Sequence, residues 1–466
     1  MNSEVFREYD IRGIVERDFD EAFLQNLGRA YATLIGSGQR VCLGRDGRLH
    51  SPRLHDQLLE GMLAGGLEVI DVGLLPTPVL YFSIMHLAAD GGIMITGSHN
   101  PPEFNGFKIC VGRDTIYGDQ IQQLRRIMEL GQLAVSVRGC QASYDVLPHY
   151  LAQLDGRVRL ARPPRVVLDA GNGTAGLVAP QALRALGCQV VEMFTEVDGR
   201  FPNHFPDPTV PANLEDLRRR VLAEAADVGF AFDGDADRLG VVDERGSVIW
   251  GDDLLVIFGR DILGRNPGAT VVAEVKCSGR LFADLAARGG RPVMWKSGHS
   301  LIRSKMREER ALLAGELTGH FFFADRYFGF DDATYAAMRL LEIFSESAGP
   351  LSALLKDLPV AHATPEIRIP CPDEAKFEVV SRLTEHFRRK KYAICDIDGA
   401  RIDFGDGAWG LVRASNTQPV VVIRCEAPTP QRLDKIRSIV QGQAQHEINS
   451  PVKSASRPSI PRSERI

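Results

Sequence analysis

The residues DGDADR at 233–238 place carboxylates at alternate positions, Asp233, Asp235 and Asp237, directly after the apolar segment GFAF. Like charges this close repel one another unless a cation lies among them. Carboxylate oxygens are the ligands that Mg²⁺ prefers. A calcium-binding EF-hand does not fit, because Arg238 stands where that loop needs glycine. The loop therefore predicts a magnesium site.

A second loop, TGSHNPP at 96–102, offers a hydroxyl to this chemistry. Glycine before Ser98 and two prolines after it predict a tight turn that holds the hydroxyl at an exposed tip. Ser98 is then a candidate nucleophile or phosphoryl carrier, with His99 and Lys108 as charge partners. From these residues alone, a plain polar turn is the simpler interpretation.

Two further loops have side chains that suit a sugar phosphate. In GELTGH at 315–320, Glu316, Thr318 and His320 are expected to alternate onto one side of an extended segment, where they would meet sugar hydroxyls. In RASNTQP at 413–419, one guanidinium and its polar neighbours could cradle a phosphate. An ordinary polar loop fits each segment as well. The phosphate-binding candidates are Arg413, Ser415, Asn416 and Thr417.

The segment GNGTAG, from Gly171 to Gly176, carries a rival prediction. It matches the GxGxxG pattern of dinucleotide-binding turns, follows a predicted strand, and precedes Glu192, which could bind a ribose. The pattern alone is common, and we interpret it as a tight turn between a strand and a helix. A nicotinamide-dependent oxidoreductase stays open as an alternative.

A threefold internal repeat positions these loops. Three segments, from Arg40, Arg165 and Thr270, each predict a strand, a turn and a helix, followed by a second strand and then a third. The third strands are continuously apolar, as expected where helices cover both faces of a sheet. They run into TGSHNPP, DGDADR and GELTGH. Because ligands gather beyond the carboxyl ends of such strands, the three loops are expected to meet at one cleft.

The fold class predicted is α/β, with three similar α/β domains of mixed, mostly parallel sheets between helices around a central cleft. A C-terminal α+β domain follows, because the residues from Pro370 lack the threefold pattern. The last residues are rich in proline and serine, and we expect a flexible tail there. The predicted boundaries are 1–145, 146–247, 248–362, 363–450 and 451–466.

Composition narrows the class of protein. Of the 466 residues 44% are hydrophobic and 25% are charged, which is ordinary for globular chains. The net charge is −5 and no long stretch is strongly basic, whereas a nucleic-acid-binding protein normally has a basic face, so we expect no nucleic-acid partner. No apolar run is long enough to span a membrane, and no membrane partner is expected. The eight cysteines form no CxxC pair and the N-terminus is charged, which favours the cytoplasm.

Together these motifs resemble a known family. YDIRG, TGSHNPPEFNGFKI, DGDADR, KCSG, GELTGH and RASNTQP, in this order, look like the α-D-phosphohexomutase superfamily, and most closely its bacterial phosphomannomutase/phosphoglucomutase branch. The resemblance runs from Phe6 to about Gln445. It implies a reversible shift of phosphate between C6 and C1 of mannose or glucose, through a phosphoserine and a bound hexose 1,6-bisphosphate that acts as activator and intermediate. The implied enzyme works on small hexose phosphates as a monomer or homodimer.

The resemblance also implies roles for individual residues. Ser98 would carry the phosphoryl group and, with Asp233, Asp235 and Asp237, hold Mg²⁺. Glu316 and Thr318 would bind sugar hydroxyls, and the 413–417 segment would clamp the phosphate that does not react. Charge stabilisers and proton carriers lining the cleft would be Arg12, His99, Lys108, Arg238, Lys276, His299 and His320. Tyr9, Lys276, His299 and His320 are also candidates for substrate binding.

The sequence leaves three points open. The branch usually has Met and Ser where this chain has Leu317 and Thr318, so the preference between mannose and glucose is undetermined. An aspartyl-phosphate enzyme is the nearest mechanistic alternative, because a strand followed by DxDx[TV] makes the first aspartate the nucleophile. Asp237 departs from that pattern. A non-catalytic sugar-phosphate-binding protein is a further alternative.

Overall fold

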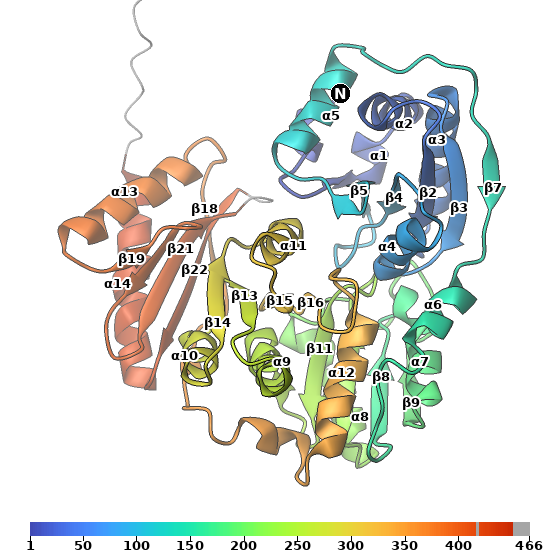
Figure 1. The fold of residues 1–466 in the computed structure, drawn as a ribbon. Coiled ribbons are helices and arrows are strands. Elements are labelled where there is room, and N and C mark those ends of the chain that lie inside the picture. Colours follow the sequence, from blue (N-terminus) through green and yellow to red (C-terminus); the bar gives the residue numbers. More distant parts are fainter. Residues whose placement is uncertain (416–418, 451–466) are drawn as a thin grey trace, which may run out of the picture. The chain divides into compact units, whose positions relative to one another are not determined.

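The computed structural model describes residues 1–415 and 419–450, which form two compact units (Figure 1). The first unit runs from Met1 to Pro359, and the second begins at Val360. Three sheets lie in the first unit and one in the second.

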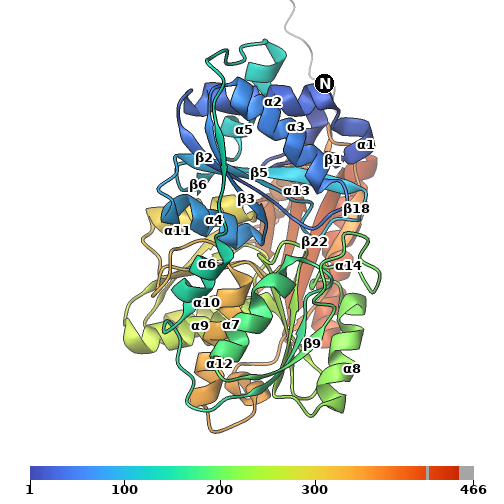
Figure 2. The ribbon, with the colours of Figure 1, turned by 90° about the vertical axis from the view of Figure 1, so that its right-hand side faces the viewer.

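The first sheet has the strand order β1-β5-β4-β2-β3-β7, with β6 paired to β5. Strands β4, β2, β3 and β7 are parallel, and β5 runs antiparallel to β4 and β1. Helices α2 and α3 lie side by side over it (Figure 2). Its elements are β1 (Ile11–Ile14), α1 (Val15–Asp18), α2 (Glu21–Ile35), β2 (Arg40–Arg45), α3 (Ser51–Ala64), β3 (Glu68–Leu74), α4 (Thr77–His86), β4 (Gly91–Ile95), β5 (Phe104–Val111), β6 (Asp114–Thr115), α5 (Asp119–Glu129) and β7 (Gln141–Ser143).

Both faces of this sheet are covered. Along β2, Val41 and Leu43 belong to a core shared with α2, α3 and α5, whereas Cys42 faces a second core that contains α4. Side chains alternate between the two faces of a strand, so a strand buried on both sides has to be apolar at every position. This explains the continuous apolar runs in the sequence. The core that contains α4 extends into the next two sheets, which joins the three into one unit.

The second sheet has the order β12-β11-β10-β8-β9, and the third the order β14-β13-β15-β16. The elements around the second are α6 (Leu147–Leu154), β8 (Arg165–Asp169), α7 (Ala179–Ala185), β9 (Gln189–Met193), α8 (Glu215–Ala223), β10 (Val228–Phe232), β11 (Leu239–Asp243) and β12 (Val248–Ile249). Those around the third are α9 (Gly251–Arg265), β13 (Thr270–Glu274), α10 (Gly279–Ala287), β14 (Arg291–Trp295), α11 (His299–Glu308), β15 (Leu313–Gly315), β16 (Phe321–Phe323) and α12 (Ala333–Glu346).

The predicted threefold repeat is present in these sheets. In each, the first strand (β2, β8 or β13) lies between the second and the third, and all three are parallel. The third strand (β4, β10 or β15) then turns back into an antiparallel neighbour. TGSHNPP, DGDADR and GELTGH are the connections at those turns. The repeat therefore presents three loops from equivalent positions of three sheets.

The second unit is an α+β domain. Its sheet has the order β17-β22-β21-β20-β19, with β18 paired to β22, and all of these pairs are antiparallel. Helices α13 and α14 share one apolar core with this sheet. The elements are β17 (His362–Ala363), β18 (Ile367–Pro370), α13 (Lys376–Arg389), β19 (Ile394–Cys395), β20 (Ala400–Asp403), β21 (Trp409–Ala414), β22 (Val420–Ala427) and α14 (Pro430–Asn449). The predicted fold class is confirmed.

Two further expectations from the sequence concern membrane-spanning helices and the cysteines. Within residues 1–415 and 419–450, we find no helix with the length and apolar character needed to cross a membrane. All eight cysteines lie in these residues, and each is a free thiol.

Candidate functional site

Ser98 lies in the loop between β4 and β5 and has a left-handed backbone, with φ of 47°. Its hydroxyl donates to Oδ2 of Asp233 at 2.7 Å and lies 3.1 Å from Nδ1 of His99. The predicted exposed tip is wrong, because only 2% of the Ser98 surface is exposed. The loop folds inward onto the aspartates. A non-glycine residue in this conformation costs free energy, so the surroundings have to hold it there.

Arg48 provides that support. Its side chain is fully buried, and each of its two terminal nitrogens donates to two backbone carbonyl oxygens of the loop. The four acceptors are the carbonyls of Ser98 (2.8 Å), Asn100 (2.6 Å), Pro101 (2.6 Å) and Phe104 (3.0 Å). Hydrogen bonds from a charged donor are stronger than those between neutral groups. One guanidinium thus fixes the loop on both sides of Ser98.

Asp46 in turn holds Arg48 and the start of the loop. One carboxylate oxygen lies 3.3 Å from Nε of Arg48 and accepts from the Gly97 amide at 3.1 Å. The other accepts from the Ser51 hydroxyl at 2.6 Å. Neither Asp46 nor Arg48 was identified from the sequence. Two charged residues directly after a fully apolar strand, in LGRDGR, were the signal that could have identified them.

The carboxylates of DGDADR lie in the loop between β10 and β11, and Asp233, Asp235 and Asp237 are all completely buried. Asp233 Oδ1 accepts from the amides of Asp237 (3.0 Å) and Arg238 (3.1 Å). Lys108, on β5, donates to Asp235 Oδ2 at 2.7 Å and also to Asp237 Oδ2. The loop thus meets a cation and the Ser98 hydroxyl from the first sheet.

The surrounding charges shift the pKa values of Asp233 and Asp237 in opposite directions. Burial, followed by the negative charges of Asp237 and Asp235, raises the pKa of Asp233 well above its ordinary value. Burial also pushes the pKa of Asp237 upward, but the positive charges of Lys108 and Arg238 outweigh it and hold that pKa low. Asp237 therefore stays ionised, whereas Asp233 needs more positive charge than these side chains supply.

The three aspartates fit a magnesium ion. One oxygen from each lies within 4.8 Å of the others, and Oδ1 of Asp235 and of Asp237 are buried with no hydrogen-bond partner. That absence holds among residues 1–415 and 419–450. Leaving such an oxygen unpaired is costly, and a divalent cation would remove the cost. A donor set made only of carboxylate oxygens suits Mg²⁺. The acidic triad can therefore hold the metal that the sequence predicted.

GELTGH connects β15 to β16 and brings Glu316 and His320 to the same region. Glu316 is buried, and its Oε1 accepts from the Gly298 amide at 2.5 Å. The predicted extended segment is wrong, because Glu316 to Gly319 form a turn in which Gly319 has φ of 95°. A side chain on Gly319 would also collide with the backbone of Leu239. Glu316, Thr318 and His320 therefore do not alternate along a strand.

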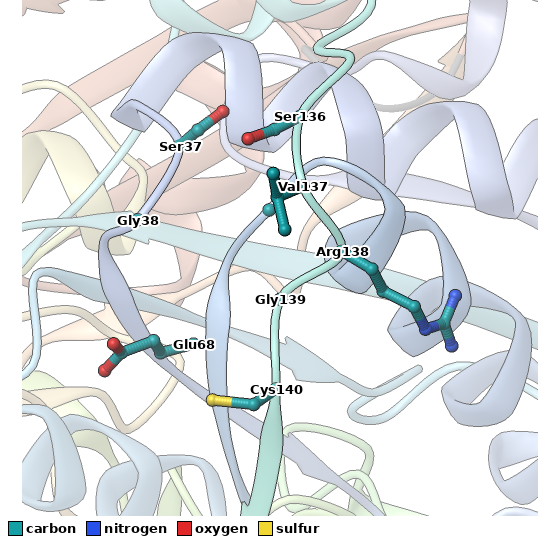
Figure 3. Close-up of a pocket in the computed structure, with 9 residues that line it drawn as sticks. Ser37, Gly38, Glu68, Ser136, Val137, Arg138, Gly139 and Cys140 are labelled. Carbon is teal, nitrogen blue, oxygen red and sulfur yellow. The ribbon is translucent and has the colours of Figure 1, made fainter.

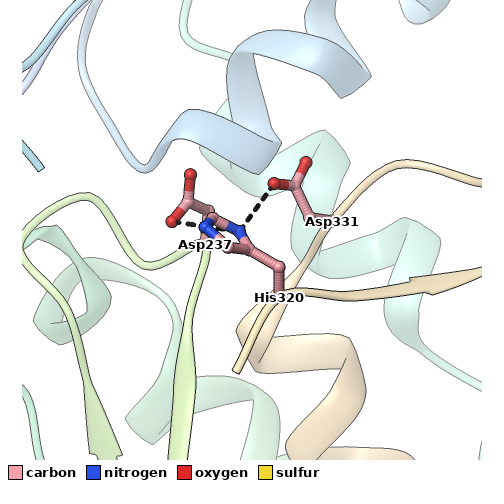
Figure 4. A group of neighbouring side chains, drawn as sticks. All are labelled: Asp237, His320 and Asp331. Atoms are coloured by element: carbon pink, nitrogen blue, oxygen red, sulfur yellow. Dashed lines mark hydrogen bonds and ion pairs between the residues drawn. The ribbon is translucent and has the colours of Figure 1, made fainter. Parts of the chain in front are cut away.

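His320 is held from both ends. Its Nε2 accepts from Nε of Arg238 at 2.9 Å, and its Nδ1 lies 2.9 Å from Asp331 and 3.6 Å from Asp237 (Figure 4). Because Nε2 acts as an acceptor, Nδ1 carries the proton and donates to Asp331. Asp331 was not identified from the sequence, because its position follows only from the packing of its loop beside β16.

Arg12, on β1, and Tyr9, just before it, make contacts with loops of the site. Arg12 donates to Asn100 Oδ1 at 3.2 Å, in the Ser98 loop. The Tyr9 hydroxyl donates to the Ser297 carbonyl at 2.7 Å, and its ring lies 6.0 Å from that of His299. The Tyr9 contacts join the region of the first sheet to residues 296–300 (KSGHS), which follow β14 of the third.

His299 and Lys276 complete the group of predicted residues in the first unit. The His299 ring stacks on that of His320 with centroids 5.6 Å apart. Burial, reinforced by the charge of Lys108, lowers the pKa of His299 to about 4, so it is neutral near pH 7. Lys276 Nζ lies 3.4 Å from Glu274 Oε2, a buried carboxylate that also accepts from the Leu317 amide.

GNGTAG forms the turn after β8, and its glycines serve backbone packing. A side chain on Gly173 would collide with the backbone of Gly234, and the Thr174 amide donates to the Gly234 carbonyl at 3.0 Å. Glu192, the candidate ribose ligand, pairs instead with Arg184. The motif thus packs against the aspartate loop at Gly234. Nothing in these contacts points to a dinucleotide-binding site.

The phosphate-binding candidates lie in the second unit. Arg413, on β21, donates to Asp398 Oδ2 at 3.0 Å. The Ser415 carbonyl accepts from Nζ of Lys376 at 2.5 Å. Arg413 and Ser415 are both buried. Asn416 and Thr417 lie outside the described residues.

A separate surface hollow lies at the edge of the first sheet, where the chain leading into β7 passes the start of β3 (Figure 3). None of its lining residues belongs to the loops described above. They are Ser37, Gly38, Gly66, Glu68, Ser136, Val137, Arg138, Gly139 and Cys140.

Comparison with known families covers nearly the whole chain. The alpha/beta/alpha domains I, II and III of phosphoglucomutase/phosphomannomutase match residues 3–133, 148–246 and 250–361. The C-terminal domain of the same proteins matches residues 366–442.

Individual relatives agree with this match. The chain is 47% identical over 445 residues to a phosphomannomutase/phosphoglucomutase of Pseudomonas aeruginosa, covering 95% of this chain and 96% of the relative. It is 43% identical over 443 residues to a phosphoglucomutase of Neisseria gonorrhoeae, covering 94% and 96%. A crystal structure of a phosphoglucomutase/phosphomannomutase family protein from Burkholderia thailandensis superposes with a TM-score of 0.89 at 41% identity, covering 96% and 98%.

Proposed function

The chain belongs to the phosphoglucomutase/phosphomannomutase family, and on that premise we propose that it interconverts hexose 6-phosphate and hexose 1-phosphate. The sugar is glucose, mannose or both. The bacterial phosphohexomutase branch indicated by the sequence motifs is confirmed by the relatives.

One observation carries the proposal: the Ser98 hydroxyl lies 2.7 Å from Asp233, at the edge of a buried triad of aspartates. A serine whose loop is held by a buried arginine, Arg48, and which lies against a cation-binding loop is suited to carry a phosphoryl group. In-line positioning and charge neutralisation supply most of the catalysis in phosphoryl transfer, and this arrangement supports both.

In the forward half-reaction, the bond between Ser98 Oγ and phosphorus breaks while a sugar hydroxyl oxygen forms a new bond to that phosphorus. The sugar hydroxyl loses a proton and Ser98 Oγ gains one, so the charges balance. His99 Nδ1, 3.1 Å from Ser98 Oγ, is the nearest imidazole to the serine end. His299 and His320 are proposed as proton carriers nearer the sugar.

Asp233, Asp235 and Asp237 would hold Mg²⁺ together with a phosphate oxygen on Ser98. The metal supplies positive charge to the transferring phosphoryl group. Lys108 and Arg238 add charge from the protein itself: Lys108 is buried and donates to Asp235 and Asp237, and Arg238 belongs to the same loop as the carboxylates.

The intermediate is a hexose 1,6-bisphosphate, which also serves as activator. It has to turn end over end so that Ser98 takes back the other phosphate. Glu316 and Thr318 are proposed to bind the sugar hydroxyls in both orientations. The phosphate that does not react would be clamped by Arg413, Ser415, Asn416 and Thr417.

The alternatives are less well supported. Both oxygens of Asp233 accept hydrogen bonds, one from two amides and one from Ser98, which makes this carboxylate a poor nucleophile for an aspartyl phosphate. The GNGTAG glycines are used in backbone packing, which argues against a nicotinamide enzyme. Only a measurement of turnover distinguishes a non-catalytic sugar-phosphate-binding protein from the proposed enzyme.

The test is a coupled assay that follows glucose 6-phosphate formed from glucose 1-phosphate, with Mg²⁺ and glucose 1,6-bisphosphate present. We expect turnover by the wild type and none by Ser98→Ala. Mannose 1-phosphate in the same format measures the sugar preference. Binding of these substrates without turnover would support the non-catalytic alternative and overturn the proposal.

Other properties remain part of the proposal. The scattered free cysteines favour the cytoplasm, and we propose a monomer or homodimer that binds neither nucleic acid nor membrane. The domain boundaries near 145, 247, 362 and 450 also remain predictions.

A further inference from the structure

Thr77 begins α4 and makes two hydrogen bonds to a single residue of the aspartate loop. Its hydroxyl donates to Asp235 Oδ2 at 2.5 Å, and its backbone amide donates to the Asp235 carbonyl at 2.9 Å. Thr77 is fully buried. A residue from the first sheet's helix thus holds both the backbone and the side chain of a residue on the second sheet's loop.

The two oxygens of Asp235 are consequently in different situations. Oδ2 accepts from the Thr77 hydroxyl and also from Lys108 Nζ at 2.7 Å. Oδ1 is buried and has no hydrogen-bond partner in the part of the chain that the structure describes. A carboxylate oxygen has two lone-pair sites, so the two donors occupy Oδ2 and leave Oδ1 for a cation.

We propose that Thr77 is a positioning residue for the metal: its hydroxyl turns Asp235 so that Oδ1 alone binds Mg²⁺. The inference rests on the proposed function only in assigning that ion to the aspartate loop. Partners of a metal ligand commonly tune its affinity in this way.

The arrangement also bears on which cation is selected. Mg²⁺ requires a compact octahedron, which suits one oxygen from each carboxylate, whereas Ca²⁺ has a larger shell and readily accepts both oxygens. With Oδ2 occupied by Thr77 and Lys108, Asp235 is restricted to one oxygen. Thr77 therefore favours Mg²⁺ over Ca²⁺.

A purely structural role for the hydroxyl can be separated from this one. The hydrogen bond from the Thr77 backbone amide to the Asp235 carbonyl can form with any residue other than proline at position 77. Thr77→Val therefore keeps this contact between α4 and the loop. Valine nearly matches threonine in shape and removes only the donor. Thr77→Ser keeps the donor and removes only the methyl group.

The experiment is titration calorimetry of the full chain with Mg²⁺ alone and with Ca²⁺ alone. Thr384→Val is the matched control, because the Thr384 hydroxyl is also buried but donates to the Val380 carbonyl within α13. We expect Thr77→Val to weaken Mg²⁺ binding by about 10–100-fold and Ca²⁺ binding by less. Thr77→Ser and Thr384→Val should bind both ions as the wild type does.

Equal Mg²⁺ affinity in Thr77→Val and the wild type would overturn the inference. So would equal weakening in Thr77→Ser or Thr384→Val, since the hydroxyl would then not be the cause. A chain that shows the expected binding differences but has no mutase turnover would overturn the proposed function alone. Failure of the wild type to bind Mg²⁺ would overturn both.

Discussion

Replacing Arg48 by lysine should loosen the Ser98 loop while keeping a positive charge in place. The guanidinium reaches four loop carbonyls and the Asp46 carboxylate. A lysine ammonium has three N–H donors where a guanidinium has five. At least one of the four carbonyls would therefore lose its partner, and the ion pair with Asp46 would be weakened.

The magnitude follows from those lost contacts. Each hydrogen bond to a charged group contributes about 1.5–3 kcal/mol, so the loss of one bond lowers the free energy of unfolding by at least that amount. Ser98 would no longer be held at its left-handed backbone angle. A displacement of about 1 Å in a reacting atom can cost about 100-fold in rate, and we expect a loss of that order in phosphorylation of Ser98.

The assay follows transfer of phosphate from glucose 1,6-bisphosphate to Ser98 by rapid quench, with urea unfolding measured in parallel. Arg339→Lys is the matched control, because Arg339 is equally buried and pairs with Asp261 and Asp325, away from the Ser98 loop. Both variants should be destabilised, but only Arg48→Lys should phosphorylate slowly. Equal phosphorylation rates in the two variants would refute the role given to Arg48.

Three further results are expected. Burial raises the pKa of Asp332 to about 6, so its contribution to stability is present below pH 3.8 and lost as the pH rises through 6. Urea unfolding should therefore show the wild type losing about 3 kcal/mol relative to Asp332→Asn between pH 4 and 7, and a constant difference would contradict this. Lys108→Met, which leaves Asp235 and Asp237 without their ammonium, should lower kcat in the coupled assay by about 100-fold; an unchanged kcat would remove Lys108 from the mechanism. Thr318→Ser should shift the ratio of kcat/KM for glucose and mannose phosphates by about tenfold or more, and an unchanged ratio would show that the methyl group does not contact the sugar.

The fold could be predicted from the sequence because each copy of the repeat shows a local pattern. Continuous apolar strands such as Gly91–Ile95 and Val228–Phe232 need cover on both faces, and polar loops follow them directly. The sequence also located the aspartate triad, because closely spaced carboxylates after a buried strand repel one another unless a cation binds among them.

The supporting residues could not be identified in the same way. Arg48 and Thr77 act across loops that are distant in the chain, and nothing local shows where a guanidinium or a hydroxyl points. The GELTGH segment was predicted to be extended because its polar residues alternate. Gly319 instead closes a turn against Leu239, a contact that only the packing of two sheets reveals.

The central claim is that Ser98 carries the phosphoryl group. The most direct measurement is peptide mass spectrometry after incubation with glucose 1,6-bisphosphate, with and without hydroxylamine. We predict a phosphate on the Ser98 peptide that survives hydroxylamine, as a serine ester does, and that is lost in Ser98→Ala. A hydroxylamine-labile phosphate on the Asp233 peptide, or no phosphate on either, would contradict the account.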